Sequence, residues 1–102
     1  MGRLVKVAEV SDLSLGEGKT VDASGQEIAL FNVDGAFYAI GNTCVHRGGP
    51  LGEGALEGDV VTCNWHGWKY NVRYGVSPVN PAARVPSYRA QVQGSDIFVE
   101  LL

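Results

Sequence analysis

Short runs in which apolar and polar residues alternate cover most of this 102-residue chain. Alternation with a period of two is typical of β-strands that bury one face. No stretch carries a convincing helical period, and no internal repeat is present. The pattern therefore predicts an all-β fold. The runs predicted as strands are residues 4–10, 20–23, 27–33, 36–40, 59–62, 68–72, 88–92 and 96–101.

Dipeptides that favour tight turns separate neighbouring runs. Ser24-Gly25 lies between the second and third runs, which we expect to pair as a hairpin. Asp34-Gly35 is a stronger signal, because a type I′ turn needs positive φ at both central residues. Gly94-Ser95 joins the last two runs as a final hairpin. Neighbours paired in this way predict a small sandwich of antiparallel sheets.

The composition is that of an ordinary globular protein, with 45% hydrophobic and 19% charged residues. These fractions argue against a disordered chain and against a membrane protein. The length predicts a single domain over residues 1–102. A net charge of -3 argues against a nucleic-acid partner.

Every cysteine and histidine of the chain lies between residues 44 and 66. Cys44 is followed by His46, and after sixteen further residues Cys63 is followed by His66. Two thiolates and two imidazoles suit a [2Fe-2S] centre with both cysteines on one iron and both histidines on the other. The same side chains could hold zinc, although Cys2His2 zinc sites usually group their cysteines as one pair and their histidines as another. A Cys44–Cys63 disulfide is the third alternative.

The residues around these four resemble the cluster-binding loops of Rieske proteins. The first loop reads Cys-Val-His-Arg-Gly-Gly-Pro-Leu-Gly and the second reads Cys-Asn-Trp-His-Gly-Trp-Lys-Tyr. The resemblance extends from about residue 34 to the C-terminus. It implies one [2Fe-2S] cluster with Cys44 and Cys63 on the buried iron and His46 and His66 on the outer iron. It also implies a Rieske-like fold whose cluster-binding loops, about residues 42–52 and 63–70, lie at one tip.

Three prolines interrupt any regular strand pairing between residues 76 and 86. In the Rieske family a proline-bearing loop covers a third side of the cluster, and residues 78–83 resemble that loop. A simple linker between two strands explains the prolines equally well. Both interpretations stay open at the level of sequence.

Positions 68 and 70, which follow His66 by two and four residues, bear on the redox potential. In high-potential Rieske proteins, a serine and a tyrosine there donate hydrogen bonds that raise the potential. Here the positions hold Trp68 and Tyr70. With one donor missing, we predict a potential near the low end of the Rieske range of roughly −150 to +300 mV. Tyr70 either donates a hydrogen bond to the Cys44 sulfur or is only a core aromatic, and we favour the second interpretation. We interpret Trp68 as a core residue and Trp65 as a side chain that shields the cluster from water.

A centre of this kind passes one electron at a time. Oxygen activation would need a further iron, commonly held by two histidines and a carboxylate, and both histidines are already assigned. No Gly-x-Gly-x-x-Gly segment marks a nicotinamide or flavin site. The chain is therefore predicted to be an electron carrier and not an enzyme.

Free-standing Rieske proteins of this length resemble the ferredoxin components of multicomponent aromatic-ring-hydroxylating dioxygenases. The resemblance implies transient docking, at the cluster tip, to an NAD(P)H-dependent reductase and to a terminal oxygenase, and a monomer suits such a shuttle. Two alternatives are the small subunit of an NADH-dependent nitrite reductase and a non-redox zinc-binding structural or regulatory module. Since the chain has no long apolar run and no cysteine to spare for a disulfide, we expect a cytoplasmic protein without membrane contact.

Overall fold

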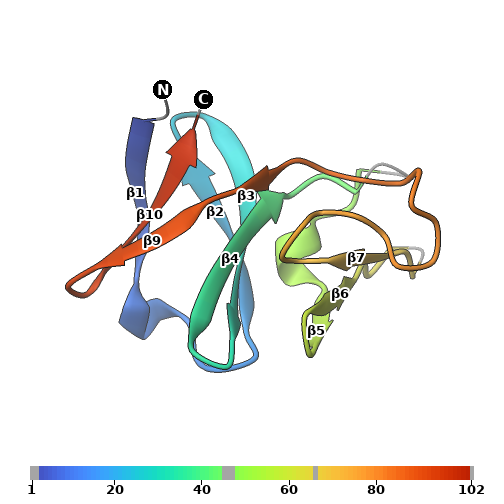
Figure 1. Cartoon of the computed structure of the whole chain (residues 1–102), viewed down its shortest axis with the longest axis horizontal. Coiled ribbons are helices and arrows are strands. Elements are labelled where there is room, and N and C mark those ends of the chain that lie inside the picture. Colours follow the sequence, from blue (N-terminus) through green and yellow to red (C-terminus); the bar gives the residue numbers. More distant parts are fainter. Residues whose placement is uncertain (1–2, 45–47, 66, 102) are drawn as a thin grey trace.

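The computed structural model describes residues 3–44, 48–65 and 67–101, and β-strands dominate these ranges (Figure 1). The strands form three small antiparallel sheets, which confirms the predicted all-β sandwich. The first sheet has the order β1 (Arg3–Glu9), β10 (Asp96–Leu101), β9 (Ala90–Gln93). The second has the order β2 (Gly18–Ala23), β3 (Gln26–Val33), β4 (Ala36–Gly41), β8 (Ser87–Tyr88). The third has the order β5 (Ala55–Glu57), β6 (Val60–Thr62), β7 (Lys69–Asn71).

Both predicted two-residue turns of the second sheet are present. Ser24 and Gly25 have φ of 52° and 89°, and Asp34 and Gly35 have φ of 52° and 93°. Positive φ at both central residues is the geometry of a type I′ turn, which suits the right-handed twist of paired strands. Asn32, itself buried, accepts the Gly35 N–H through its side-chain oxygen at 2.8 Å. The local sequence thus fixes the β2–β3–β4 meander.

The run 88–92 is not one strand, as the alternation predicted. β8 pairs with β4 in the second sheet, whereas β9 pairs with β10 in the first. Arg89 lies between them, and its carbonyl accepts the Glu100 N–H at 2.9 Å. The chain crosses from one sheet to another without losing its alternation, so the crossing leaves no sign in the sequence. The three-residue strand β5 was also not predicted.

The first predicted strand ends at Glu9, one residue early, because residues Val10–Asp12 form the 3-10 turn η1. The Asp12 carboxylate accepts the Glu9 N–H at 2.9 Å and so draws the chain out of the sheet. A second 3-10 turn, η2 (Leu51–Glu53), follows the first ligand loop. In the described ranges, no helix is long and apolar enough to cross a membrane.

β3 is buried on both faces and separates two hydrophobic cores. Ala29 and Phe31 contribute to one core, and Ile28 and Leu30 to the other. The second core is completed by the first sheet, and the first core by the third sheet, so the second sheet lies between the other two (Figure 1). The third sheet and its loops therefore form one end of the molecule, and this end carries both cysteines.

Arg73, just after β7, ties the third sheet to the second. Its Nε lies 3.3 Å from a carboxylate oxygen of Asp59, and its guanidinium carbon lies 5.1 Å from the centroid of the Tyr38 ring in β4. Each such partly exposed contact contributes about 1 kcal/mol or less. The main hold on the third sheet is therefore its apolar packing.

Candidate metal centre

Each cysteine is the first residue of a six-residue loop closed by a β-pair. An antiparallel bridge between Thr43 and Pro50 closes the first loop. The pairing of Thr62 with Lys69, at the end of the β6–β7 hairpin, closes the second. The two loops therefore have the same length and are each closed at the base by an antiparallel pair.

The two loops share one backbone frame. In each, the cysteine N–H donates to the carbonyl five residues later, at 3.0 Å in the first loop and 2.7 Å in the second. The N–H four residues after the cysteine donates back to the cysteine carbonyl, at 2.8 and 3.0 Å. That fourth residue is Gly48 in one loop and Gly67 in the other, with φ of 77° and 75°, where glycine is favoured. The described residues of the two loops therefore share the same closing hydrogen bonds and a glycine at the same position.

Both thiols are buried and lie in contact with the opposite loop or with the core. Cys44 and Cys63 are each 2% exposed and belong to the core shared with the third sheet. Neither forms a disulfide, so that alternative is wrong. A Cβ on Gly49 would lie 2.8 Å from the Cys63 sulfur, which shows how closely the first loop approaches the second thiol. Since Gly49 also accepts the Cys44 N–H, it joins the two cysteines.

Tyr70 reaches one of these sulfurs. Its side chain is fully buried on β7, and its hydroxyl oxygen lies 3.4 Å from the Cys44 sulfur. A thiolate is an acceptor only, so towards a metal-bound Cys44 the tyrosine hydroxyl is the donor. The interpretation of Tyr70 as only a core aromatic is therefore wrong: the residue fills the core and also bonds the sulfur.

The donors that the structure describes fit an iron–sulfur centre. Buried thiols on two contacting loops can bind metal as thiolates, because the metal compensates charges that burial alone would disfavour. Within residues 3–44, 48–65 and 67–101 no three cysteine, histidine, aspartate or glutamate side chains gather around a point that could hold a metal ion. His46 and His66, the two predicted imidazole ligands, lie outside the described residues.

The proline-bearing segment lies beside the second ligand loop. Ser77, buried, accepts the N–H groups of Val79 and Asn80 through its hydroxyl, each at 3.2 Å, and so shapes the segment. Between it and the loop is a hollow of about 230 Å³. The interpretation of residues 78–83 as a loop that covers the cluster stays a prediction. The hollow is lined by Gly67, Trp68, Lys69, Ser77, Val79 and Asn80.

The two tryptophans of the second loop differ in exposure. Trp68 is partly buried and packs against the core, which confirms its predicted role. Trp65 is 56% exposed, and its ring lies against Gly49 of the first loop. It therefore covers the junction of the two loops with one face and presents the other to solvent.

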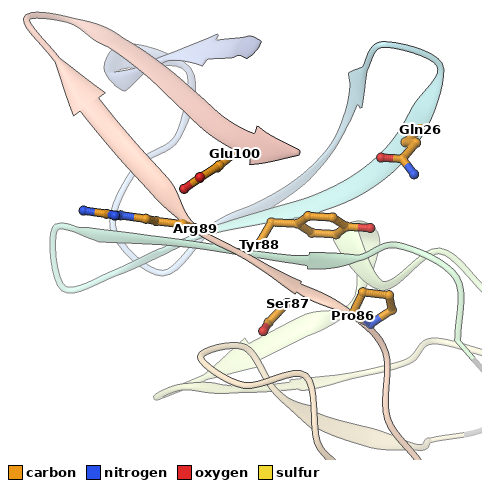
Figure 2. Close-up of a pocket in the computed structure, with 6 residues that line it drawn as sticks. All are labelled: Gln26, Pro86, Ser87, Tyr88, Arg89 and Glu100. Carbon is orange, nitrogen blue, oxygen red and sulfur yellow. The ribbon is translucent and has the colours of Figure 1, made fainter. Parts of the chain in front are cut away.

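A larger hollow, of about 490 Å³, lies away from both thiols (Figure 2). It is an open depression where β8 passes the start of β3 and the end of β10, and most of its side chains are solvent-exposed. Its lining contains no thiol or imidazole, so it offers no metal site. The lining residues are Gln26, Pro86, Ser87, Tyr88, Arg89 and Glu100.

The family model for the Rieske [2Fe-2S] domain matches residues 3–89 of the chain. The chain is 40% identical over 94 residues to the 3-phenylpropionate/cinnamic acid dioxygenase ferredoxin subunit of Shigella boydii serotype 4 (strain Sb227), covering 90% of this chain and 88% of that protein. It is 37% identical over 97 residues to the biphenyl dioxygenase ferredoxin subunit of Pseudomonas sp. (strain KKS102), covering 93% and 89%.

Solved structures give the same picture. A chain in the complex of reduced oxygenase and oxidized ferredoxin in carbazole 1,9a-dioxygenase is 32% identical, with a TM-score of 0.85 over 94% of this chain and 91% of that chain. A protein described as an NADH-dependent nitrite reductase small subunit, from Mycobacterium tuberculosis, has a TM-score of 0.92 over 100% and 97% of the two chains. At 24% identity, the second likeness shows the fold alone.

Proposed function

This chain belongs to the Rieske [2Fe-2S] domain family and is a one-electron carrier with one Rieske cluster, and we propose that it passes electrons from an NAD(P)H-dependent reductase to a terminal oxygenase. It is not itself an enzyme, because its relatives are ferredoxin subunits of dioxygenase systems. The observation that carries the proposal is the identity of 37% and 40% to two such subunits over nine-tenths of the chain. Family membership also favours iron and sulfide over the zinc alternative.

We propose that Cys44 and Cys63 hold one iron and that His46 and His66 hold the other. The support is the matching hydrogen bonds that close the two loops, the burial of both thiols, and the close approach of Gly49 in the first loop to the Cys63 sulfur in the second. The bound cluster supplies one-electron redox chemistry. The chain's own residues exclude water from the thiol side, through the core around Tyr70, and donate a hydrogen bond to the Cys44 sulfur.

The hollow beside the second ligand loop is the proposed docking feature for the oxygenase. Val79 is 77% exposed and Trp65 is 56% exposed, which is unusual for large apolar side chains. Trp65 lies in the loop that follows Cys63, and Val79 lines the hollow beside this loop, which is the proposed exit for the electron. We propose that an apolar side chain of the oxygenase packs into this hollow and that Lys69, at its rim, faces an acidic group of the oxygenase.

Replacing Val79 by serine tests the docking proposal. The second-order rate of electron transfer to the oxygenase should fall roughly 5- to 30-fold, because one apolar contact of this size is worth roughly 1–2 kcal/mol. The midpoint potential and EPR spectrum should stay unchanged. Val92→Ser is the matched control, since Val92 is 44% exposed on β9, in the first sheet. Equal rates for the two variants would contradict docking at the hollow.

The choice of electron acceptor is tested with two probes. Protein reduced under anaerobic conditions is mixed with the oxidised terminal oxygenase of a biphenyl dioxygenase system, and in parallel with the catalytic subunit of an NADH-dependent nitrite reductase. Re-oxidation is followed by visible absorption. The proposal predicts rapid re-oxidation by the oxygenase. Rapid re-oxidation by the nitrite reductase subunit alone would instead support that alternative.

Three further proposals concern the chain as a whole. We propose that residues 1–102 form one Rieske domain, which is supported by the pairing of β1 with β10. We propose a monomer, because a shuttle that visits two partners needs small, weak interfaces. We propose the cytoplasm as its compartment, which is supported by the two free thiols. Sedimentation equilibrium and fractionation of cells test the last two.

A further inference from the structure

We propose that the turn η2 (Leu51–Glu53) is a brace that fixes the two ligand loops relative to each other, and that Asn42 and Asn64 are the positioning residues that hold it. The inference rests on the proposed ligand set and goes beyond it. It identifies how two loops whose cysteines are nineteen positions apart in sequence keep one relative position.

Asn42 attaches the brace to the first loop and to the second sheet. Its side chain is 3% exposed, and its amide oxygen accepts the Gly52 N–H at 2.8 Å and the Thr20 hydroxyl at 3.1 Å. Its backbone carbonyl accepts the Leu51 N–H at 2.7 Å. Because Asn42 precedes Cys44 by two residues, these bonds join the start of the loop to the turn that follows its end.

Glycines bring the brace into direct backbone contact with its neighbours on two sides. A Cβ on Gly52 would lie 2.6 Å from the backbone nitrogen of Thr20 in β2. A Cβ on Gly54, which ends the turn, would clash with the carbonyl oxygen of Thr62, the residue before Cys63. Only glycine permits backbones to approach this closely. The turn is therefore wedged between β2 and the strand that leads into the second loop.

Asn64 attaches the brace to the second loop. Its side-chain Nδ2 donates to the Glu53 carbonyl at 2.8 Å. Asn64 is the residue directly after Cys63, so this bond reaches the loop next to its thiol. A continuous path of hydrogen bonds thus runs from Thr20 through Asn42 and the turn to Asn64.

Partners one step removed from metal ligands orient those ligands, and their loss typically lowers metal affinity roughly 10- to 100-fold. We therefore expect Asn42→Leu to lose its visible absorption roughly 10- to 100-fold faster than the wild type in the presence of an iron chelator. Asn64→Ala, an exposed change that leaves the core intact, should accelerate the loss less and shift the g-values of the reduced protein. Asn42→Asp keeps an acceptor oxygen and should restore most of the wild-type rate.

Asn32→Leu is the matched control, because Asn32 is also a buried asparagine with two side-chain bonds, to the Leu13 carbonyl and the Gly35 N–H. It should lower the denaturation midpoint while leaving the g-values unchanged. The brace is overturned if Asn42→Leu and Asn64→Ala both keep wild-type g-values and loss rates, or if Asn32→Leu changes the g-values equally. A wild-type protein without a Rieske EPR signal would overturn the ligand set and the brace together.

Discussion

Replacing Tyr70 by phenylalanine should lower the midpoint potential by about 30–60 mV. The hydroxyl lies 3.4 Å from the Cys44 sulfur in a fully buried site, and a donor to that sulfur favours the more negative, reduced state. A hydrogen bond to a charged group is worth roughly 1.5–3 kcal/mol. At 59 mV per tenfold change for one electron, 1.5 kcal/mol corresponds to about 65 mV. We expect at least about half of this shift in potential, because the strength of a long hydrogen bond to sulfur changes only partly between the oxidised and the reduced state.

The assay is a redox titration followed by visible circular dichroism or EPR, on wild type and variant in the same buffer. Tyr38→Phe is the matched control, since Tyr38 packs against the same core and interacts with Arg73 through its ring. It should leave the potential unchanged. A Tyr70→Phe potential equal to that of the wild type, or higher, would refute the assignment of the hydroxyl as a donor. The wild-type potential itself should lie in the lower half of the Rieske range.

Two other predictions concern packing and charge. A Cβ on Gly49 would meet the Cys63 sulfur at 2.8 Å and the Trp65 ring at 2.9 Å, so Gly49→Ala should cost about 1–3 kcal/mol and reduce iron per protein; unchanged denaturation and iron content would contradict this. Asp96 raises the pKa of Lys6 above its ordinary value of 10.5, through a hydrogen bond and through its negative charge. The Lys6–Asp96 pair therefore stabilises the fold below pH 10.5, and this stabilisation is lost as the pH rises through the folded-state pKa of Lys6. In Lys6→Met the urea denaturation midpoint should therefore fall less steeply as the pH is raised above 10.5. The same slope in variant and wild type would contradict the stabilising role of the Lys6–Asp96 pair.

Local chemistry made much of the fold predictable. The Asp34-Gly35 turn requires positive φ at two successive residues, and the strands on either side alternate, so sequence fixes the turn and the register together. The four candidate ligands are likewise visible because the chain has no other cysteine or histidine. The spacing of the four residues alone left both an iron–sulfur cluster and a zinc ion possible. The resemblance to Rieske proteins then favoured the cluster and assigned a role to each ligand.

Contacts between distant segments were not predictable in the same way. Tyr70 is 26 residues from Cys44, and only the packing of the third sheet brings its hydroxyl to the sulfur. Asn42 and Asn64 carry no sequence signal either, because an asparagine in a loop usually bonds its own backbone. Their bonds to the turn η2 depend on how the loops stack in space.

The most direct test of the central claim is pulsed EPR on the dithionite-reduced protein labelled with nitrogen-15 at histidine, with iron and sulfide measured on the same sample. The account predicts one [2Fe-2S] cluster per chain and hyperfine couplings from two histidine nitrogens. One coupling should disappear when His46 is substituted and the other when His66 is substituted. A colourless protein containing zinc, or a cluster without histidine couplings, would contradict it.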